Sequence, residues 1–135
     1  MSDVWEGGVA QRFVDRLRAA VAPTFATMQL IRPSGQELAK GTTIADRGYN
    51  ACWQTASSLA NGARAGADII GLTRSFQLDH PRENEEAPRS DGVGMRLFNG
   101  TEEVGMVGLL GVPAREAVAI VRQVAQEFGM EVAQP

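Results

Sequence analysis

The spacing of apolar residues near the start of the chain predicts an amphipathic helix. Between Val4 and Val21 the apolar positions recur at intervals of three and four residues, which places them on one stripe of a helix. The stripe consists of Val9, Phe13, Leu17, Ala20 and Val21. Polar side chains fill the rest of the segment. Pro23 ends this helix, because the residue before a proline avoids the helical backbone conformation.

The period then changes to two, which is typical of a strand. Over residues 25–32 apolar side chains alternate with Thr27 and Gln29, a pattern that predicts a half-buried strand. Residues 33–36, Pro-Ser-Gly-Gln, predict a turn, since proline presets one backbone dihedral and glycine accepts a positive φ. Residues 37–41 are then the returning strand of a hairpin.

A second helix and a short strand are expected in the middle of the chain. Residues 46–59 carry an apolar stripe at helical spacing, and Asn61-Gly62 ends the helix. The apolar run 67–72 predicts a short buried strand. Residues 79–92 hold two prolines, many charges and almost no apolar side chain, so we expect an exposed loop there.

The last third of the chain predicts a strand pair and a closing helix. Residues 94–98 and 104–112 flank Asn99-Gly100, a strong signal for a hairpin turn. Because residues 104–112 are apolar almost throughout, we expect this strand to be central and covered on both faces. A helix is expected to begin at Pro113 and to end before Gly129, since proline is favoured at helix starts and glycine just past helix ends.

The order of these elements indicates an α+β domain. We expect a sheet of about five strands, mainly antiparallel because hairpins connect them, with flanking helices packed on it. The 135 residues, 1–135, are enough for a single domain with its own core.

Composition and charge narrow the function classes. A net charge of −3 argues against nucleic acid as a partner, since nucleic-acid binding needs a basic surface. The sequence has no run of about 20 apolar residues and no leader-like start, so we expect a cytoplasmic protein without a membrane partner. Because Cys52 is the only cysteine, an internal disulfide and a cysteine-rich zinc site are excluded.

Three features have both a structural and a functional interpretation. Gly105, Gly108 and Gly111 lack the context of a phosphate-binding loop, so they favour a close approach of a helix to the strand. The alternative is an anion site at the start of the last helix. The only histidine, His80, is expected to be a solvated loop residue, with an axial haem ligand or a general base as the alternatives. Cys52 is expected to pack in the interior.

A polar cluster at a strand-to-helix junction is the strongest candidate for ligand binding. Hydroxyls, an arginine fork and free helix N–H groups together suit a small carboxylate. The candidate ligand-binding residues are Thr42, Thr43, Asp46, Arg47, Tyr49, Asn50 and Arg96. Helix capping and surface polarity are the alternative for the junction, and a solvated strand face is the alternative for Arg96. No recognisable catalytic arrangement is present, so we expect no catalytic residues, no metal site and a binding function rather than an enzyme.

Several segments resemble the sugar diacid recognition domain, the N-terminal sensor of bacterial carbohydrate diacid regulators. They are residues 10–17, 27–43, 94–97 and the glycine-rich strand 103–112 with the helix after it. The resemblance implies a PAS/Cache-like fold, with a profilin-like fold as the alternative, and a ligand that is a small carboxylate, hydroxy acid or sugar diacid. The sequence departs from the family at residues 43–51, where the family's histidine and glutamate are missing. We expect no DNA-binding region.

A second resemblance is to small haem-binding and haem-degrading domains of the glycolate-locus type. These domains also end with a glycine-containing strand and a helix that starts at proline, which residues 104–116 resemble. This resemblance implies haem as cofactor and assembly into homo-oligomers. The expected function is a sensor-like domain that binds a small carboxylate without a cofactor and forms a homodimer or larger homo-oligomer. The alternatives are a haem-binding domain and an interaction module that binds no ligand.

Overall fold

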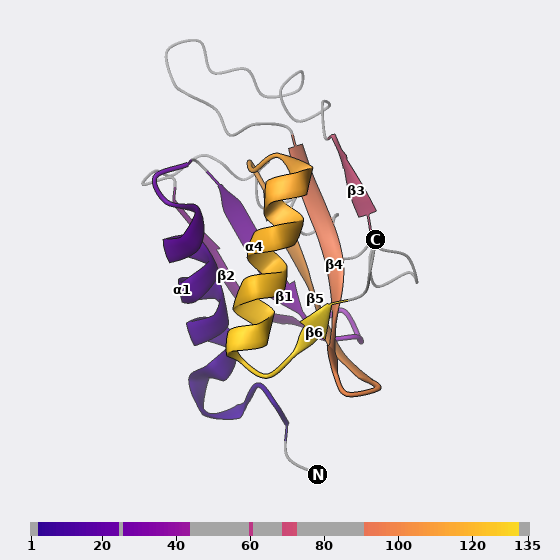
Figure 1. The fold of residues 1–135 in the computed structure, drawn as a ribbon. Coiled ribbons are helices and arrows are strands. Elements are labelled where there is room, and N and C mark those ends of the chain that lie inside the picture. Colours follow the sequence, from indigo (N-terminus) through magenta and orange to yellow (C-terminus); the bar gives the residue numbers. More distant parts are fainter. Residues whose placement is uncertain (1–2, 25, 44–59, 61–68, 73–90, 133–135) are drawn as a thin grey trace.

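A computed structural model of the chain describes residues 3–24, 26–43, 60, 69–72 and 91–132. Within these residues a short 3-10 helix, two α-helices and six strands follow one another (Figure 1). Their bounds are η1 (Glu6–Gly8), α1 (Val9–Val21), β1 (Thr27–Ile31), β2 (Glu37–Thr42), β3 (Ile69–Leu72), β4 (Asp91–Asn99), β5 (Glu102–Leu110), α4 (Ala114–Glu127) and β6 (Glu131–Val132). The helix expected over residues 46–59 lies outside the described residues.

The strands form one antiparallel sheet in the order β2-β1-β5-β4-β3, and β6 also pairs with β4 (Figure 1). This confirms the expected α+β class with a mainly antiparallel sheet. Strand β5 lies between β1 and β4, and every residue from Val104 to Leu110 is buried, so the expected central strand is also confirmed. Two details differ from the sequence analysis. Asp91 and Gly92 belong to β4 rather than to the charged loop, and β6 was not expected.

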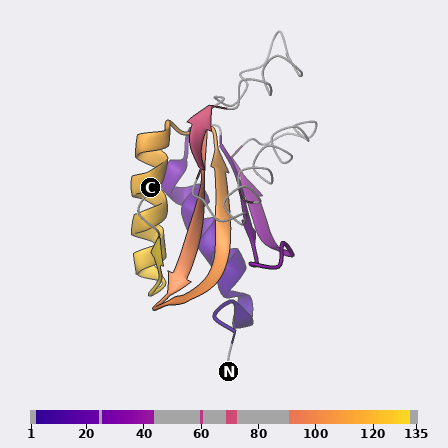
Figure 2. The same ribbon diagram turned by 90° about the vertical axis from the view of Figure 1, so that its right-hand side faces the viewer.

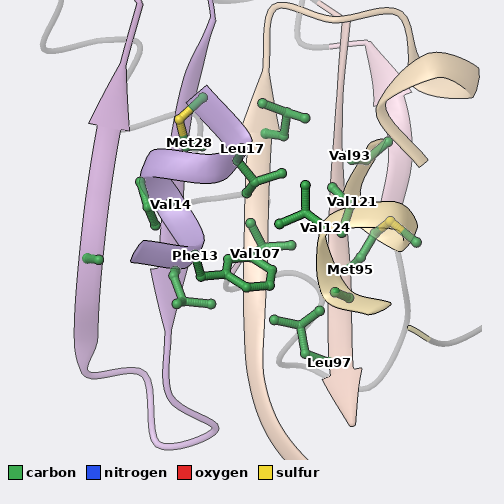
Figure 3. Close-up of a cluster of buried hydrophobic side chains, with 14 of the residues drawn as sticks. Phe13, Val14, Leu17, Met28, Val93, Met95, Leu97, Val107, Val121 and Val124 are labelled. Carbon is green, nitrogen blue, oxygen red and sulfur yellow. The ribbon is translucent and has the colours of Figure 1, made fainter. Parts of the chain in front are cut away.

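Helices α1 and α4 lie side by side on one face of the sheet, which we call the helical face (Figures 1 and 2). Each helix turns its apolar stripe toward the strands, because burial of apolar area is the main favourable term in folding. Alternate strand residues fill the layer between, as Figure 3 shows. The cluster includes Phe13, Val14, Leu17, Met28, Val93, Met95, Leu97, Val107, Val121 and Val124.

The opposite face of the sheet, which we call the second face, is covered as well. Strand β1 is buried along its whole length, including the polar residues Thr27 and Gln29, which are 1% and 9% exposed. On this side Ile31 and Met106 form a small apolar cluster with Ala60. The expectation of a half-buried β1 is therefore wrong, because alternation along a strand shows which residues share a face but not whether something covers it.

Backbone conformation explains why the first helix is shorter than expected. Gly7 and Gly8 have φ angles of 71° and 80°, in the left-handed region that interrupts a right-handed helix. The helix expected from Val4 is therefore divided into η1 and α1, and α1 begins only at Val9.

The closing helix α4 begins one residue later than expected and ends as expected. Pro113 has an extended ψ of 138° and is the residue before the first helical one. Gly129 has a φ of 74°, and the N–H of Met130 donates to the carbonyl of Ala125 at 2.8 Å, which satisfies one of the last carbonyls. No helix among the described residues is long and apolar enough to span a membrane.

The hairpin between β4 and β5 carries a turn and a bulge. Gly100 has a φ of 68° in the turn, as the Asn-Gly signal predicts. The register shifts between Leu97 and Phe98, so Leu97 pairs with Gly105 and Gly94 pairs with Gly108. A side chain at Gly105 would meet the carbonyl oxygen of Ile31 at 2.9 Å and the Trp5 ring at 3.3 Å. The nearest neighbours of Gly105 are thus an adjacent strand and Trp5, not a helix as expected.

Candidate functional site

The second face of the three central strands differs in chemistry from the helical face. Side chains that alternate with the core residues point to this side. They are Thr27, Gln29 and Ile31 on β1, Arg96 and Phe98 on β4, and Met106 and Leu110 on β5. The helical face is lined by apolar side chains, whereas this face combines apolar groups with a buried amide and a guanidinium. We therefore take the second face as the candidate site.

Two glycines occupy the middle of the second face. Gly94 on β4 and Gly108 on β5 are direct register partners, and both are buried. We call them the glycine pair. Because glycine has no side chain, a group that lies against this pair meets the backbone of two neighbouring strands directly. Gln29 is the register partner of Gly108 on the other side, so the amide borders the glycine pair.

The Gln29 side chain is held on one side only. Its Nε2 donates to Oε1 of Glu37 at 2.7 Å. Its own Oε1 is fully buried and has no hydrogen-bond partner among the residues that the structure describes. Buried polar atoms nearly always have a partner, because leaving one unsatisfied costs about 1–3 kcal/mol. This acceptor therefore needs an explanation.

Arg96 supplies positive charge at the same face. It is the register partner of Met106 on β5, and its side chain is 28% exposed. The guanidinium carbon lies 5.5 Å from the centre of the Phe98 ring, within the range of a cation–π contact. One of its nitrogens lies 3.9 Å from Oε1 of Glu103, a long ion pair. These two contacts hold the guanidinium over β4 while part of it faces solvent.

Thr42 and Thr43 use their hydroxyls to hold β2 against the start of β1. The Oγ1 of Thr42 donates to the carbonyl of Ala26 at 3.0 Å. The Oγ1 of Thr43 accepts from the N–H of Ala26 at 2.8 Å and donates to the carbonyl of Thr24 at 2.5 Å. Both hydroxyls therefore satisfy backbone groups of this connection.

The structure does not bring Thr42 and Arg96 together. Thr42 pairs with Thr27, which is in register with Leu110 and then with Gly92 on β4. Strand spacing and rise place the Cα atoms of Thr42 and Arg96 roughly 20 Å apart. The remaining candidates of that site, Asp46, Arg47, Tyr49 and Asn50, lie outside the described residues, as do His80 and Cys52.

The described residues contain no cluster of three histidine, cysteine, aspartate or glutamate side chains that would hold a metal ion. Among the described residues, the pair whose pKa values are clearly shifted, Asp3 and Arg32, lies at the N-terminal segment. Arg32 donates to Asp3, whose carboxylate also accepts the N–H of Trp5 at 3.0 Å. These bonds lower the pKa of Asp3 below its ordinary value and raise that of Arg32. The pair ties the N-terminal segment to the end of β1.

Sequence reasoning missed Gln29 and the glycine pair. Gln29 appeared as one of the polar positions of an alternating strand, the normal sign of a solvated face. Only the cover over the second face turns this position into a buried amide. Gly94 and Gly108 come into register because of the bulge at Leu97 and Phe98; without it Gly94 would face Val107. No sequence signal for that bulge was available.

The fold and the second face define an α+β domain with two helices on one side of an antiparallel sheet and a mixed polar and apolar surface on the other. The sequence matches no family model, and no curated protein is significantly similar to it. Among solved structures, the fold is similar to one described as the crystal structure of the PduOC:heme complex. The TM-score is 0.61 at 13% identity, and the match covers 95% of this chain and 98% of that chain. At this identity the likeness shows a shared fold.

Proposed function

We propose that this protein is a haem-binding domain. The observation that carries the proposal is the match, over nearly the full length of both chains, to a structure that was solved with haem. The second face suits a flat, largely apolar macrocycle in two ways. The glycine pair carries no side chains, and Ile31, Met106 and Leu110 would be apolar contacts for the ring. Arg96 would pair with a propionate group at the edge of the ring.

An iron ligand must come from a small set of side chains. Haem iron is held by histidine, cysteine, methionine or tyrosine, and when bound it supplies a redox-active, gas-binding centre. His80, Cys52 and Tyr49 are each the only residue of their type in the chain, and Met106 lies on the second face. Of these, His80 would be the residue that holds the iron, because neutral imidazole is a common metal ligand.

A hemin titration tests this proposal. We expect the Soret band to shift and sharpen in the wild-type protein and this change to be lost in His80→Ala. Arg96→Gln should weaken binding about tenfold, the equivalent of one charge-assisted hydrogen bond. Arg115→Gln, at an exposed position of α4, is the matched control and should bind like wild type. An unchanged wild-type spectrum rules out haem binding. Normal binding by His80→Ala would mean that the iron is held by Tyr49, Cys52 or Met106 instead.

A small carboxylate is the second candidate ligand, and Arg96 is the observation that favours it. A guanidinium fixed over an aromatic ring at the edge of a partly apolar face is suited to bind one carboxylate. A sugar diacid, in contrast, receives no support from the comparisons. The expected homo-oligomer and the cytoplasmic location remain predictions.

A further inference from the structure

We infer that Asn99 is a site of spontaneous deamidation, which converts the turn between β4 and β5 into a mixture of aspartyl and isoaspartyl forms. The backbone nitrogen of Gly100 attacks Cγ of Asn99, the side-chain nitrogen of Asn99 leaves as ammonia, and a five-membered succinimide ring forms. Water then opens the ring at either of its carbonyl carbons, so the reaction consumes water and needs no enzyme. The inference concerns the end of this hairpin and does not depend on any ligand of the second face.

The attacking nitrogen of Gly100 is free to react. Asn99 and Glu102 are register partners, which leaves a loop of two residues between them. Gly100 has a φ of 68° and Thr101 has no positive φ, the combination of a type II′ turn. The closing hydrogen bonds of such a turn use the N–H groups of the residues that flank the loop. The N–H of Gly100 accordingly has no hydrogen-bond acceptor among the described residues, so the attack breaks no existing bond.

The space around the turn accommodates the ring. Asn99, Gly100 and Thr101 are all exposed. A Cβ atom added at Gly100 would meet nothing within 4 Å, and glycine itself has no side chain to hinder the approach of its nitrogen. The side-chain amide of Asn99 has no hydrogen-bond partner within the described part of the chain, so its nitrogen is free to leave.

Local opening of the hairpin controls the reaction. Asn99 is the last residue of β4, and its extended backbone holds Cγ away from the nitrogen of Gly100. Ring closure therefore requires rotation about ψ of Asn99, which opens the pair with Glu102 but leaves the next pair, Phe98 with Glu103, intact. Pairs at the end of an element open far more readily than the core of a sheet. We therefore expect deamidation to proceed without global unfolding.

The test follows Asn99 by peptide mapping of the full chain after incubation at mildly alkaline pH. Trypsin cleaves after Arg96 and Arg115, and Asn99 is the only asparagine in the resulting peptide 97–115. Mass spectrometry with chromatography resolves its aspartyl and isoaspartyl products. We expect conversion in the folded protein to be about tenfold to hundredfold slower than in the chain unfolded by denaturant, the range for opening of a terminal pair.

Asn99→Gln is the control, because glutamine would have to form a six-membered ring, which closes much more slowly. It should abolish conversion of peptide 97–115 and leave conversion of Asn61, in the separate tryptic peptide 48–64, unchanged. A folded rate below the expected range overturns the inference, because Asn99 would then react only after global unfolding. Conversion of peptide 97–115 that persists in Asn99→Gln also overturns it.

Deamidation should weaken the end of the hairpin. An aspartate at residue 99 places a second carboxylate directly opposite Glu102, and like charges across a ladder are destabilising. The variant Asn99→Asp should therefore lower the melting temperature at low salt by about 1–4 °C, and Glu102→Gln in the same chain should restore it. An unchanged melting temperature of Asn99→Asp would contradict this effect on the hairpin.

Discussion

At the scale of single residues, Trp5 links the N-terminal segment to both α1 and β5, a role that the apolar spacing of the sequence did not predict. It is 5% exposed, and its indole N–H donates to the carbonyl of Val104 at 2.8 Å. Its ring lies edge-on to Phe13 with 5.7 Å between centroids, and it fills the space beside Gly105. A tryptophan that is buried with its N–H paired fixes both an apolar contact and a backbone group.

Replacing Trp5 with phenylalanine should therefore be costly although it keeps an aromatic ring. The carbonyl of Val104 loses this donor, and we expect the free energy of unfolding to fall by about 1–3 kcal/mol. Denaturant unfolding followed by circular dichroism measures the change. A loss below about 0.5 kcal/mol would show that this hydrogen bond contributes little.

At the scale of elements, the packing of α1 against α4 combines apolar contacts with one ion pair. Phe13 on α1 and Phe128 just after α4 have ring centroids 5.3 Å apart. At the surface, Arg16 makes two hydrogen bonds to the carboxylate of Glu127, at 2.8 and 3.1 Å. The two side chains are 42% and 36% exposed, so solvent weakens the interaction.

A double-mutant cycle with Arg16→Ala and Glu127→Ala should give a coupling energy of about 0.5 kcal/mol at low salt. It should largely disappear in about 1 M salt, where the Debye length falls to about 3 Å. The control is the pair Arg18 and Asp15 within α1, which is 3.8 Å apart and more exposed, at 52% and 49%. If both pairs give the same coupling, the two-bond geometry of Arg16 adds nothing.

At the scale of the whole molecule, the N-terminal segment is tied to the sheet by charge. Asp3 precedes η1, and its partner Arg32 directly follows β1, so the pair joins parts of the chain that are 29 residues apart. The pKa of Asp3 is lowered by the bond from Arg32 first and by the N–H of Trp5 second. A carboxylate with a depressed pKa stabilises the fold while it is ionised.

The pair predicts a specific loss of stability in acid. The contribution of Asp3 should be fully present above its ordinary pKa of 3.8 and should disappear as the pH falls through its lower value in the folded protein. The difference in free energy of unfolding between wild type and Asp3→Asn should therefore be constant at neutral pH and shrink in that acidic window. Arg32→Met should show the same pH dependence, since it breaks the same pair. A difference independent of pH would exclude this linkage.

The two faces of the whole sheet differ in chemistry. The helical face holds the large apolar cluster and carries α1 and α4 (Figures 2 and 3). The second face holds the buried amide, the glycine pair and Arg96. Substitutions on the first side are expected to act through packing, and, under the proposed function, substitutions on the second side should change ligand binding.

Local patterns predicted much of the fold, because each depends on neighbours in sequence. Helical spacing identified α1 and α4, alternation identified β1, and Asn99-Gly100 identified the turn between β4 and β5. Strand β6 was not predicted, because two residues are too few to show a period. Helix α1 is shorter than predicted because Gly7 and Gly8 adopt left-handed backbone conformations. The spacing of apolar residues carries no information about these conformations.

The sequence by itself determined the class of fold, the helical core and the central position of β5, because the free energy of burying apolar stripes leaves few alternatives for these segments. The candidate site was decided only by tertiary structure. A one-residue bulge sets Gly94 opposite Gly108, and the cover over the second face turns Gln29 from a surface position into a buried acceptor. Register and burial are properties of strands brought together from distant parts of the chain, and no short window of sequence contains them.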